Sequence, residues 1–392
     1  MDSSDTTYMI MITDCFPGLS ATTTFWMANA IAVFSVCVLC TGLLIPQILL
    51  ISFRKRLFDQ PDERKIHQGA VPRLGGIAFK PVVFFSIALM FGLCQFFGYG
   101  NMFDGISAES RPLAFSFCCV MLLYLVGMAD DLIGIRYKAK FAVQIMCGVM
   151  MIAGGMWISN LHGLFGIHEV AAWFGYPLTI LVIVFIINSI NLIDGIDGLA
   201  SGLCGVATLF YGMVFFLLQE YIYAVLSFAT LGVLVPFFYY NVFGDANKQK
   251  KIFMGDTGSL TTGMVLCVLS LKILQYPPTS VPDRFPDLLI FAYSPLFIPC
   301  LDVVRVYLHR VRNGKNPFLP DKNHIHHKLL AVGMRQRAAM VTIISFSLLF
   351  TLCNLWLSMY MGITLLLAAD VLIWTMTNIW LTHKIHRINR KL

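Results

Sequence analysis

Charged side chains are scarce in this chain. Asp, Glu, Lys and Arg make up 12% of its 392 residues, about half the share found in an ordinary soluble domain. Hydrophobic residues make up 58%, and the mean hydropathy is +0.75. This composition excludes a soluble globular protein and indicates a protein of the membrane.

The chain also lacks the marks of a secreted, repetitive or multidomain protein. Residues 1–24 contain no Lys or Arg, so they do not resemble a secretory signal. The eleven cysteines have no zinc-type spacing and lie mostly in apolar runs, which predicts small buried side chains rather than disulfides. No internal repeat or low-complexity segment is visible. We therefore expect a single integral-membrane domain over residues 1–392.

Long apolar runs dominate what is present. A spanning helix needs about 20 mostly apolar residues, and eleven runs qualify as candidates. They lie near residues 25–51, 77–97, 113–129, 139–158, 171–190, 198–218, 221–240, 257–275, 286–304, 338–358 and 362–382. The ninth run contains Pro295 and Pro299, and because proline removes a backbone donor we expect that helix to bend. The predicted fold class is an all-α polytopic membrane protein.

The basic residues predict the orientation of these helices. If the N-terminus is outside, the inner segments hold nearly all Lys and Arg, including the long loop 305–337 and the tail 383–392. Only Arg111 and Arg284 occur in the outer loops. Cytoplasmic loops carry such an excess of positive charge, so the C-terminus is predicted to be cytoplasmic. The net charge of +7 reflects this topology, and because it is spread over short loops we expect no nucleic-acid partner.

Four polar clusters lie at the predicted inner ends of the helices. The first is Asp130-Asp131, which ends the third run. Adjacent carboxylates repel each other and are costly near lipid, so the pair needs a cation, a proton or a functional reason. A solvated helix end is the alternative. Lys138 and Lys140 follow closely and could supply counter-charge or bind phosphate.

The second cluster repeats a polar residue at every third position. Asn188, Asn191, Asp194 and Asp197 lie beside Ile and Leu, and on a helix this spacing keeps successive side chains adjacent. The glycines after each Asp allow the helix to end there, so that the last carboxylates can turn towards a common centre. Packing explains one or two such residues, but it explains four poorly.

The third cluster is the segment Phe253-Met-Gly-Asp256-Thr-Gly-Ser at the start of the eighth run. An ordinary N-cap is one interpretation, because Asp, Thr or Ser at a helix start accepts from free backbone N–H groups. An anion site is the other, because a helix N-terminus with flexible glycines also binds anions. Phe253 could stack on a flat ring or could simply pack.

The fourth cluster is His324, His326 and His327 in the long inner loop. Three histidines in four residues can bind a metal or donate hydrogen bonds to phosphate oxygens, and a solvated loop is the alternative. The first inner loop adds His67 and Arg73 in a basic, glycine-bearing entry to the second run. By itself that entry could be a positive-inside anchor.

Taken together, these motifs resemble the polyprenyl-phosphate N-acetylhexosamine-1-phosphate transferase superfamily, glycosyltransferase family 4, which contains WecA, TagO and MraY. The resemblance extends from about residue 50 to residue 330, with the motifs in the right order. The first inner loop and the His-Ile-His-His spelling are closer to the WecA/TagO branch than to MraY. One departure is Gly134, which stands where some WecA-type members have a further Asp.

The resemblance implies an enzyme that moves a sugar 1-phosphate from a UDP-sugar to a polyprenyl phosphate and releases UMP. The expected pair is UDP-GlcNAc and undecaprenyl phosphate, at the cytoplasmic face of a bacterial inner membrane, with Mg²⁺ or Mn²⁺ as cofactor. Another UDP-HexNAc or UDP-MurNAc-pentapeptide remains the alternative donor, and an ion-coupled transporter is a distant alternative. The sequence leaves a homodimer open.

The resemblance also implies roles for individual residues. It places the metal between Asn191 and Asp256, and it gives catalytic roles to Asp130, Asp131, Asp194 and Asp197. Contacts with the substrates are implied for eight residues, namely Phe253, Lys140, His324, His326, His327, His67, Arg73 and Asn188.

Overall fold

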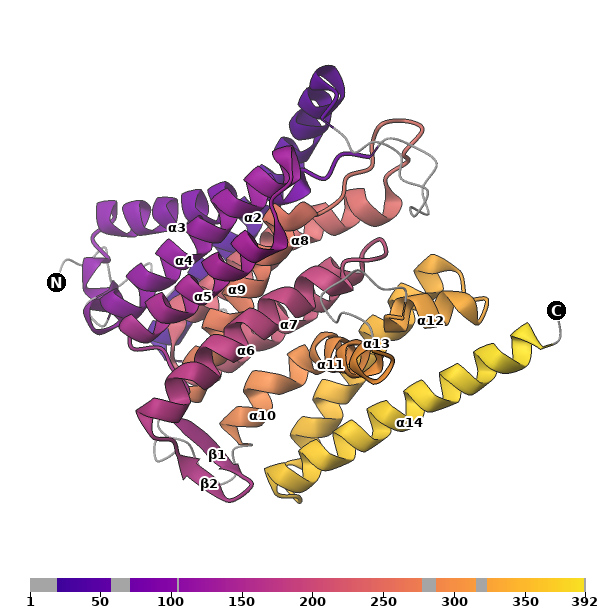
Figure 1. The fold of residues 1–392 in the computed structure, drawn as a ribbon. Coiled ribbons are helices and arrows are strands. Elements are labelled where there is room, and N and C mark those ends of the chain that lie inside the picture. The colour runs from indigo at the N-terminus through magenta and orange to yellow at the C-terminus, as the bar shows by residue number, and fades with distance from the viewer. Residues whose placement is uncertain (1–19, 58–70, 104–105, 277–286, 315–322, 391–392) are drawn as a thin grey trace.

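The computed structural model describes residues 20–57, 71–103, 106–276, 287–314 and 323–390. Within these ranges the protein is a bundle of long helices with a single two-stranded hairpin (Figure 1). Ten of the described helices are long and apolar enough to cross a membrane. This confirms the prediction of an all-α polytopic membrane protein.

The helices follow the predicted apolar runs closely. The first half of the chain contains α2 (Ala21–Lys55), η1 (Gly75–Ala78), α3 (Phe79–Phe96), η2 (Gly100–Phe103), α4 (Ile106–Ile133), α5 (Tyr137–Ala153), β1 (Asn160–Leu164), β2 (Ile167–Glu169) and α6 (Ala172–Ile193). The second half contains α7 (Leu199–Leu217), α8 (Tyr221–Phe243), α9 (Gly255–Leu274), α10 (Leu288–Tyr293), η4 (Ser294–Leu296), α11 (Phe297–Arg312), α12 (Ile325–Ala331), α13 (Gln336–Leu357) and α14 (Ile363–Asn389).

The fourth predicted run is where the structure departs most from the sequence analysis. α5 has only 17 residues, and it is not among the ten helices above. Gly155 ends it with a φ of 88°, and the N–H of Met156 closes back on the carbonyl of Met151 at 2.9 Å, as in a Schellman motif. The chain then forms the antiparallel hairpin β1–β2, which was not predicted from the sequence.

The predicted ninth run is divided into α10, the 3-10 turn η4 and α11. Pro295 lies in η4, and Pro299 lies in the first turn of α11, where a missing N–H is tolerated. Polar side chains from the last two helices meet this break. Asn354 donates to Ser294 Oγ at 3.2 Å and to Asp370 Oδ2 at 2.9 Å. The irregular segment is therefore buried in protein, as membrane depth requires.

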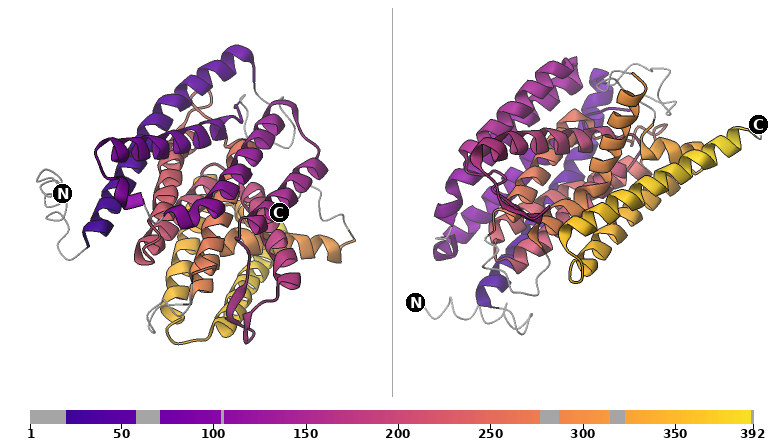
Figure 2. Two further views of the ribbon diagram at one scale, coloured as in Figure 1. Left: turned by 90° about the vertical axis from the view of Figure 1, so that its left-hand side faces the viewer. Right: turned by 60° about the horizontal axis from the view of Figure 1, so that its bottom comes forward.

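α9 occupies the centre of the bundle, and every residue in its apolar window is buried. It packs against α4, α6, α10 and η1, whereas α14 runs along the edge in Figure 1 and in the right-hand view of Figure 2. Glycines permit the close approach at its N-terminal end. A Cβ on Gly127 of α4 would lie 2.6 Å from the Cα of Thr257, and a Cβ on Gly76 would overlap Gly258. The first turn of α9 is thus fixed between α4 and η1.

Candidate functional site

The Asp131 carboxylate caps the N-terminus of α9. The residue before that helix, Met254, supplies no side-chain cap. Instead, Asp131 Oδ1 accepts from the Asp256 N–H at 2.8 Å, and Oδ2 accepts from the Thr257 N–H at 2.9 Å and the Thr257 hydroxyl at 2.5 Å. The cap therefore comes from α4 and not from Asp256 itself, which lies inside the first turn and leaves its side chain available.

Gly255 lies where three segments of the chain meet. Its φ is 70°, and a Cβ there would lie 2.5 Å from Asp131 Oδ2 and would overlap the Arg73 carbonyl. Backbone hydrogen bonds join the first inner loop to this point. Gly75 N–H donates to the Phe253 carbonyl at 3.0 Å, and Phe253 N–H donates to the Pro72 carbonyl at 2.8 Å. The loop that carries Arg73 is thereby held against the acidic cluster.

Asp130 and Asp256 share the ammonium group of Lys140. Its Nζ lies 3.1 Å from Asp130 Oδ2 and 2.7 Å from Asp256 Oδ2, and all three side chains are partly buried. Oxygens of Asp130, Asp131 and Asp256 lie within 4.8 Å of one another. Two like charges about 4 Å apart near a protein surface repel by about 4 kcal/mol, so this cluster depends on cationic charge.

Asn191 of α6 reaches the same cluster. Its Nδ2 donates to Asp256 Oδ1 at 3.2 Å and to Ser259 Oγ at 2.8 Å. Asn188, one turn earlier, instead donates to Gln144 Oε1 of α5 at 2.6 Å. Asn188 and Asn191 are regularly spaced in the sequence but have different partners. Asn191 is the one whose amide lies next to Asp256.

The turn between α6 and α7 carries Asp194 and Asp197. Lys251 Nζ binds Asp197 Oδ2 at 2.6 Å, and the Asn241 side chain accepts from the Gly198 N–H at 2.6 Å. Asp194 is exposed to solvent along part of its surface. The protein around its carboxyl group displaces water and so raises its pKa to about 7. The negative charges of Asp256 and Asp197 raise the pKa further. Asp197 is thus held in an ion pair, whereas Asp194 faces outward.

The histidine cluster packs directly onto this turn. The His326 ring covers Gly195, and a Cβ at that glycine would lie 2.6 Å from the ring's Cε1. The rings of His324 and His326 are parallel within 4°, with centroids 5.8 Å apart. Burial, followed by the charges of His327 and His324, lowers the pKa of His326 to about 3. His326 is therefore neutral at physiological pH.

The structure brings together most, but not all, of the residues singled out in the sequence. Asp130, Asp131, Asp256, Lys140 and Asn191 form one connected cluster, while the α6–α7 turn and the histidines form a second. His67 lies outside the described residues.

Several contributors to the site were not predicted, chiefly Asp302, Gln144, Asn241 and Lys251. An acid inside an apolar run was a visible signal for Asp302. The other three gave no signal, because their importance lies only in the partners that the fold brings to them.

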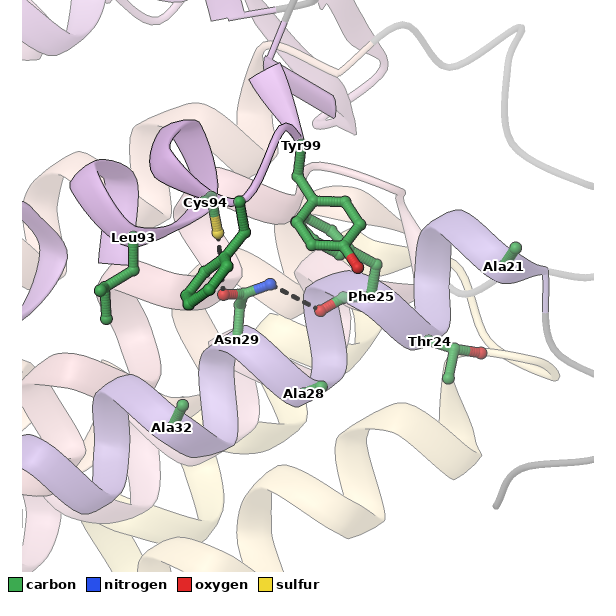
Figure 3. Close-up of a pocket in the computed structure, with 10 residues that line it drawn as sticks. Ala21, Thr24, Phe25, Ala28, Asn29, Ala32, Leu93, Cys94 and Tyr99 are labelled. Carbon is green, nitrogen blue, oxygen red and sulfur yellow. Dashed lines mark hydrogen bonds between the residues drawn. The ribbon is translucent and has the colours of Figure 1, made fainter. Parts of the chain in front are cut away.

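A separate cavity lies far from this chemistry, between the N-terminal half of α2 and the C-terminal end of α3 (Figure 3). Its volume is about 280 Å³, and its lining is mostly apolar. Asn29 projects into it and is held by the Phe25 carbonyl at 2.9 Å and the Cys94 thiol at 3.4 Å. No charged residue lines this cavity, so it offers no means of binding a phosphate or a metal.

The acidic cluster fits a divalent metal ion. Carboxylates supply the oxygen ligands that hard cations prefer, and three converge here. Asn191 could join them through its amide oxygen, provided that the amide turns over, because its Nδ2 faces Asp256 in this structure. A metal ion here would provide the positive charge that Lys140 supplies now.

Comparison with known proteins gives consistent matches. The family model described as glycosyl transferase family 4 matches residues 113–274, a range that includes Asp130, Asp131, the α6–α7 turn and Asp256. An undecaprenyl-phosphate alpha-N-acetylglucosaminyl 1-phosphate transferase of Salmonella typhi is 32% identical over 289 residues, which are 73% of this chain and 72% of the relative. The Escherichia coli K12 protein of the same name is 31% identical over the same shares.

A more complete match comes from Bacillus subtilis strain 168. That relative is named "Probable undecaprenyl-phosphate N-acetylglucosaminyl 1-phosphate transferase" and is 29% identical over 354 residues, which are 88% of this chain and 92% of the relative. The match therefore extends well beyond the segment covered by the family model.

Proposed function

The chain belongs to glycosyl transferase family 4, and from this membership we propose that it transfers N-acetylglucosamine 1-phosphate from UDP-GlcNAc to undecaprenyl phosphate. The chain is a multi-pass membrane phosphoglycosyltransferase that uses a polyprenyl phosphate. We also propose that UMP is released at the cytoplasmic face of a bacterial inner membrane. The product would start the synthesis of a lipid-linked glycan of the cell envelope.

One observation above all supports this proposal. Asp130, Asp131 and Asp256 converge at the N-terminus of the buried helix α9, next to Lys140 and Asn191. Both substrates are anions, so a site that joins them must neutralise their repulsion and align the reacting oxygens. Carboxylates that hold a cation, together with a lysine and histidines, would neutralise this repulsion and align the oxygens.

The reaction we propose is a single in-line displacement. An oxygen of the lipid phosphate forms a bond to the β-phosphorus of the donor, the one that carries the sugar. The bond from that phosphorus to the bridging oxygen breaks, and UMP leaves with the bridging oxygen. The second pKa of a phosphate monoester is near ~6, so the lipid phosphate is already largely ionised at neutral pH. Alignment is therefore needed more than a general base.

The contacts of the two adjacent acids suggest how they divide the work. The Asp131 carboxylate is engaged by three donors of α9, so we assign it the task of fixing Asp256. Asp130 is held by Lys140 and by the Ile135 N–H at 2.7 Å. We assign to Asp130 the alignment of the lipid phosphate next to Lys140.

The remaining assignments come from the family resemblance. Asp194, at the open side of the α6–α7 turn, would help to position the sugar, and Asp197 would hold the turn through Lys251. Phe253 would lie under the uracil. Phosphate oxygens of the substrates would be met by five basic residues and one amide: Lys140, Arg73, His324, His326, His327 and Asn188. His67 stays a prediction from the sequence.

We propose Mg²⁺, with Mn²⁺ as a substitute, for the acidic cluster. Asp256 and Asn191 would hold the ion, with Asp130 next to it. When bound, it would neutralise charge on the donor diphosphate. The residues of the site would position the donor diphosphate and the lipid phosphate for the transfer.

The orientation we propose places the N-terminus outside and the C-terminus in the cytoplasm. Lys140 and Lys251 bind acids of the site, and Arg305 binds Asp302 next to His324. These basic residues at the site support its cytoplasmic placement.

The decisive experiment offers the purified protein undecaprenyl phosphate and a panel of UDP-sugars, with the lipid product identified by mass. We expect a product that carries GlcNAc 1-phosphate and an equal amount of UMP. A product formed only from another UDP-HexNAc or from UDP-MurNAc-pentapeptide would replace the donor assignment. Absence of UMP release with every donor would contradict the enzyme and would favour transport.

The single-displacement mechanism has its own test. A covalent aspartyl-phosphate would allow labelled UMP to exchange into the UDP-sugar without lipid. We expect no exchange in enzyme that has been freed of lipid, and exchange at a rate near turnover would overturn the direct attack.

A further inference from the structure

Asp302 is a completely buried acid on α11, with 0% of its side chain exposed. A buried carboxylate is costly unless it is paired and hydrogen-bonded. Its partners lie on its own helix and at the entry to α12, the short helix that carries the histidines. None of the four polar clusters recognised in the sequence includes it.

Three groups donate to this carboxylate. His324 Nδ1 lies 2.8 Å from Oδ2, and the Ile325 N–H lies 3.0 Å from Oδ1. Arg305, one turn along α11, lies 2.8 Å from Oδ1 and also donates to the Asn323 carbonyl. Asp302 therefore caps α12, orients the first histidine and, through Arg305, holds the backbone just before it.

The contact with His324 sets which ring nitrogen carries hydrogen. A carboxylate accepts, so Nδ1 must donate, and Nε2 is left facing away from Asp302. Without hydrogen Nε2 accepts a proton from a protonated phosphate, and it donates to a phosphate oxygen only when the ring carries hydrogen on both nitrogens. The oriented ring lies parallel to His326, which in turn covers Gly195. A continuous set of contacts thus runs from Asp302 to the turn that carries Asp194.

A second contact of α12 runs to α14. Lys328 Nζ donates to Thr382 Oγ1 at 3.0 Å and lies 3.4 Å from the Asn378 carbonyl, both on α14. This contact fixes the helix but touches no histidine ring. It provides a way to loosen α12 without changing the hydrogen position on His324.

We infer that Asp302 is a positioning residue for the transfer, holding His324 with hydrogen on Nδ1 so that Nε2 faces the phosphates. The inference rests on the proposed function, because it presumes that His324 meets a substrate phosphate. It assigns to Asp302 an effect on turnover that passes through His324 and not merely through the stability of the fold.

A double-mutant cycle tests this path. The wild type, Asp302→Asn, His324→Gln and the double variant are compared in lipid nanodiscs with UDP-GlcNAc and undecaprenyl phosphate. We expect Asp302→Asn alone to lower kcat by about 10- to 100-fold, as the loss of a group that orients a histidine does elsewhere, with a smaller change in KM. In the His324→Gln background the same change should lower kcat by less than about threefold.

Two control variants separate positioning from stability. Asp370→Asn removes another buried acid, which binds Tyr293 and Asn354 away from the histidines. Thr382→Val removes the α14 partner of Lys328 and loosens α12 from α14 without changing a charge. We expect Asp370→Asn to keep kcat within about twofold of the wild type, and we expect the Thr382→Val and Asp302→Asn losses to multiply. If the Asp302→Asn and His324→Gln losses multiply instead, Asp302 does not act through His324 and the inference is wrong.

A measurement on the unmutated protein covers the case in which Asp302→Asn fails to fold. In protein labelled with ¹⁵N-histidine, the His324 signals are identified by their loss in His324→Gln. We expect hydrogen on Nδ1, and hydrogen on Nε2 alone would overturn the inference. If the wild type forms no product from any UDP-sugar, the proposed function is wrong and this inference falls with it. An active wild type with multiplying losses rejects only the inference.

Discussion

The Asp131 side chain binds the backbone of Asp256, because Asp131 Oδ1 accepts the hydrogen bond of the Asp256 N–H at 2.8 Å. Asp131 thus caps the N-terminus of α9, the helix end that carries Asp256. A carboxylate at a helix N-terminus is also favoured by the helix dipole. Asp131 and its sequence neighbour Asp130 therefore have different structural roles.

This difference predicts that Asp131→Asn and Asp130→Asn affect stability unequally. In Asp131→Asn the new side-chain amide would turn an NH₂ group towards one of the α9 donors, so this variant should be destabilised by about 0.5–2 kcal/mol, the range for a lost cap. Asp130→Asn keeps an oxygen for the Ile135 N–H and should change stability little. Both should lose activity. Thermal unfolding in detergent, measured beside kcat, checks this, and equal melting temperatures would contradict it.

Gly195 predicts a second effect on stability. The His326 ring occupies the space of a Cβ at this glycine, so Gly195→Ala should destabilise the protein by about 1–3 kcal/mol, as overpacking does, and should lower kcat. Adding His326→Ala should restore much of the stability, because the small side chain makes room.

Gly205→Ala is the matched control for this prediction. A Cβ there would lie 3.7 Å from the Leu231 side chain, which is an ordinary contact for a residue of α7. It should be neutral or slightly stabilising, because alanine favours a helix more than glycine does. The melting temperatures of the wild type, Gly195→Ala, the double variant with His326→Ala, and Gly205→Ala are compared. A Gly195→Ala protein as stable as Gly205→Ala would contradict the packing of His326 on Gly195.

The sequence was a good guide to what its own local pattern determines. Apolar runs located the long helices, and polar clusters at the ends of those runs located Asp130, Asp194 and Asp256, because lipid makes such residues costly. The hairpin at 160–169 was missed because its two strands are short and include glycine and histidine, without the alternation that marks a strand.

The partners within the site could not be predicted in the same way. Asp131 meets Asp256 and Thr257 across 125 and 126 positions of the chain, and His326 meets Gly195 across a similar interval. No local pattern encodes such pairs, because they depend on how whole helices pack. Asp302 was visible as an acid in an apolar run, but its link to His324 appears only in the fold.

The acidic cluster predicts a requirement for a divalent metal. Chelation should abolish the transfer, and added Mg²⁺ or Mn²⁺ should restore it. Asp256→Asn should lower kcat by about 100-fold or more, the usual cost of losing one group that stabilises a transition state. Asp245→Asn serves as the control, because Asp245 is an exposed acid of the α8–α9 loop whose carboxylate accepts from the Asn247 N–H. Turnover is followed as UMP release, and full activity in EDTA would rule out the metal.

His326 predicts how stability depends on pH. Its pKa is about 3 in the folded protein and near ~6.5 when unfolded, so between these values the unfolded state binds the additional proton. Stability should therefore be greatest above about pH 6.5 and should fall as the pH drops towards about 3. Acidification from about pH 7.5 to about pH 4.5 should cost roughly 2–3 kcal/mol through this residue. His326→Gln should lose correspondingly less stability over that range in melting experiments, and parallel pH curves for the two proteins would show that His326 is not buried against the α6–α7 turn.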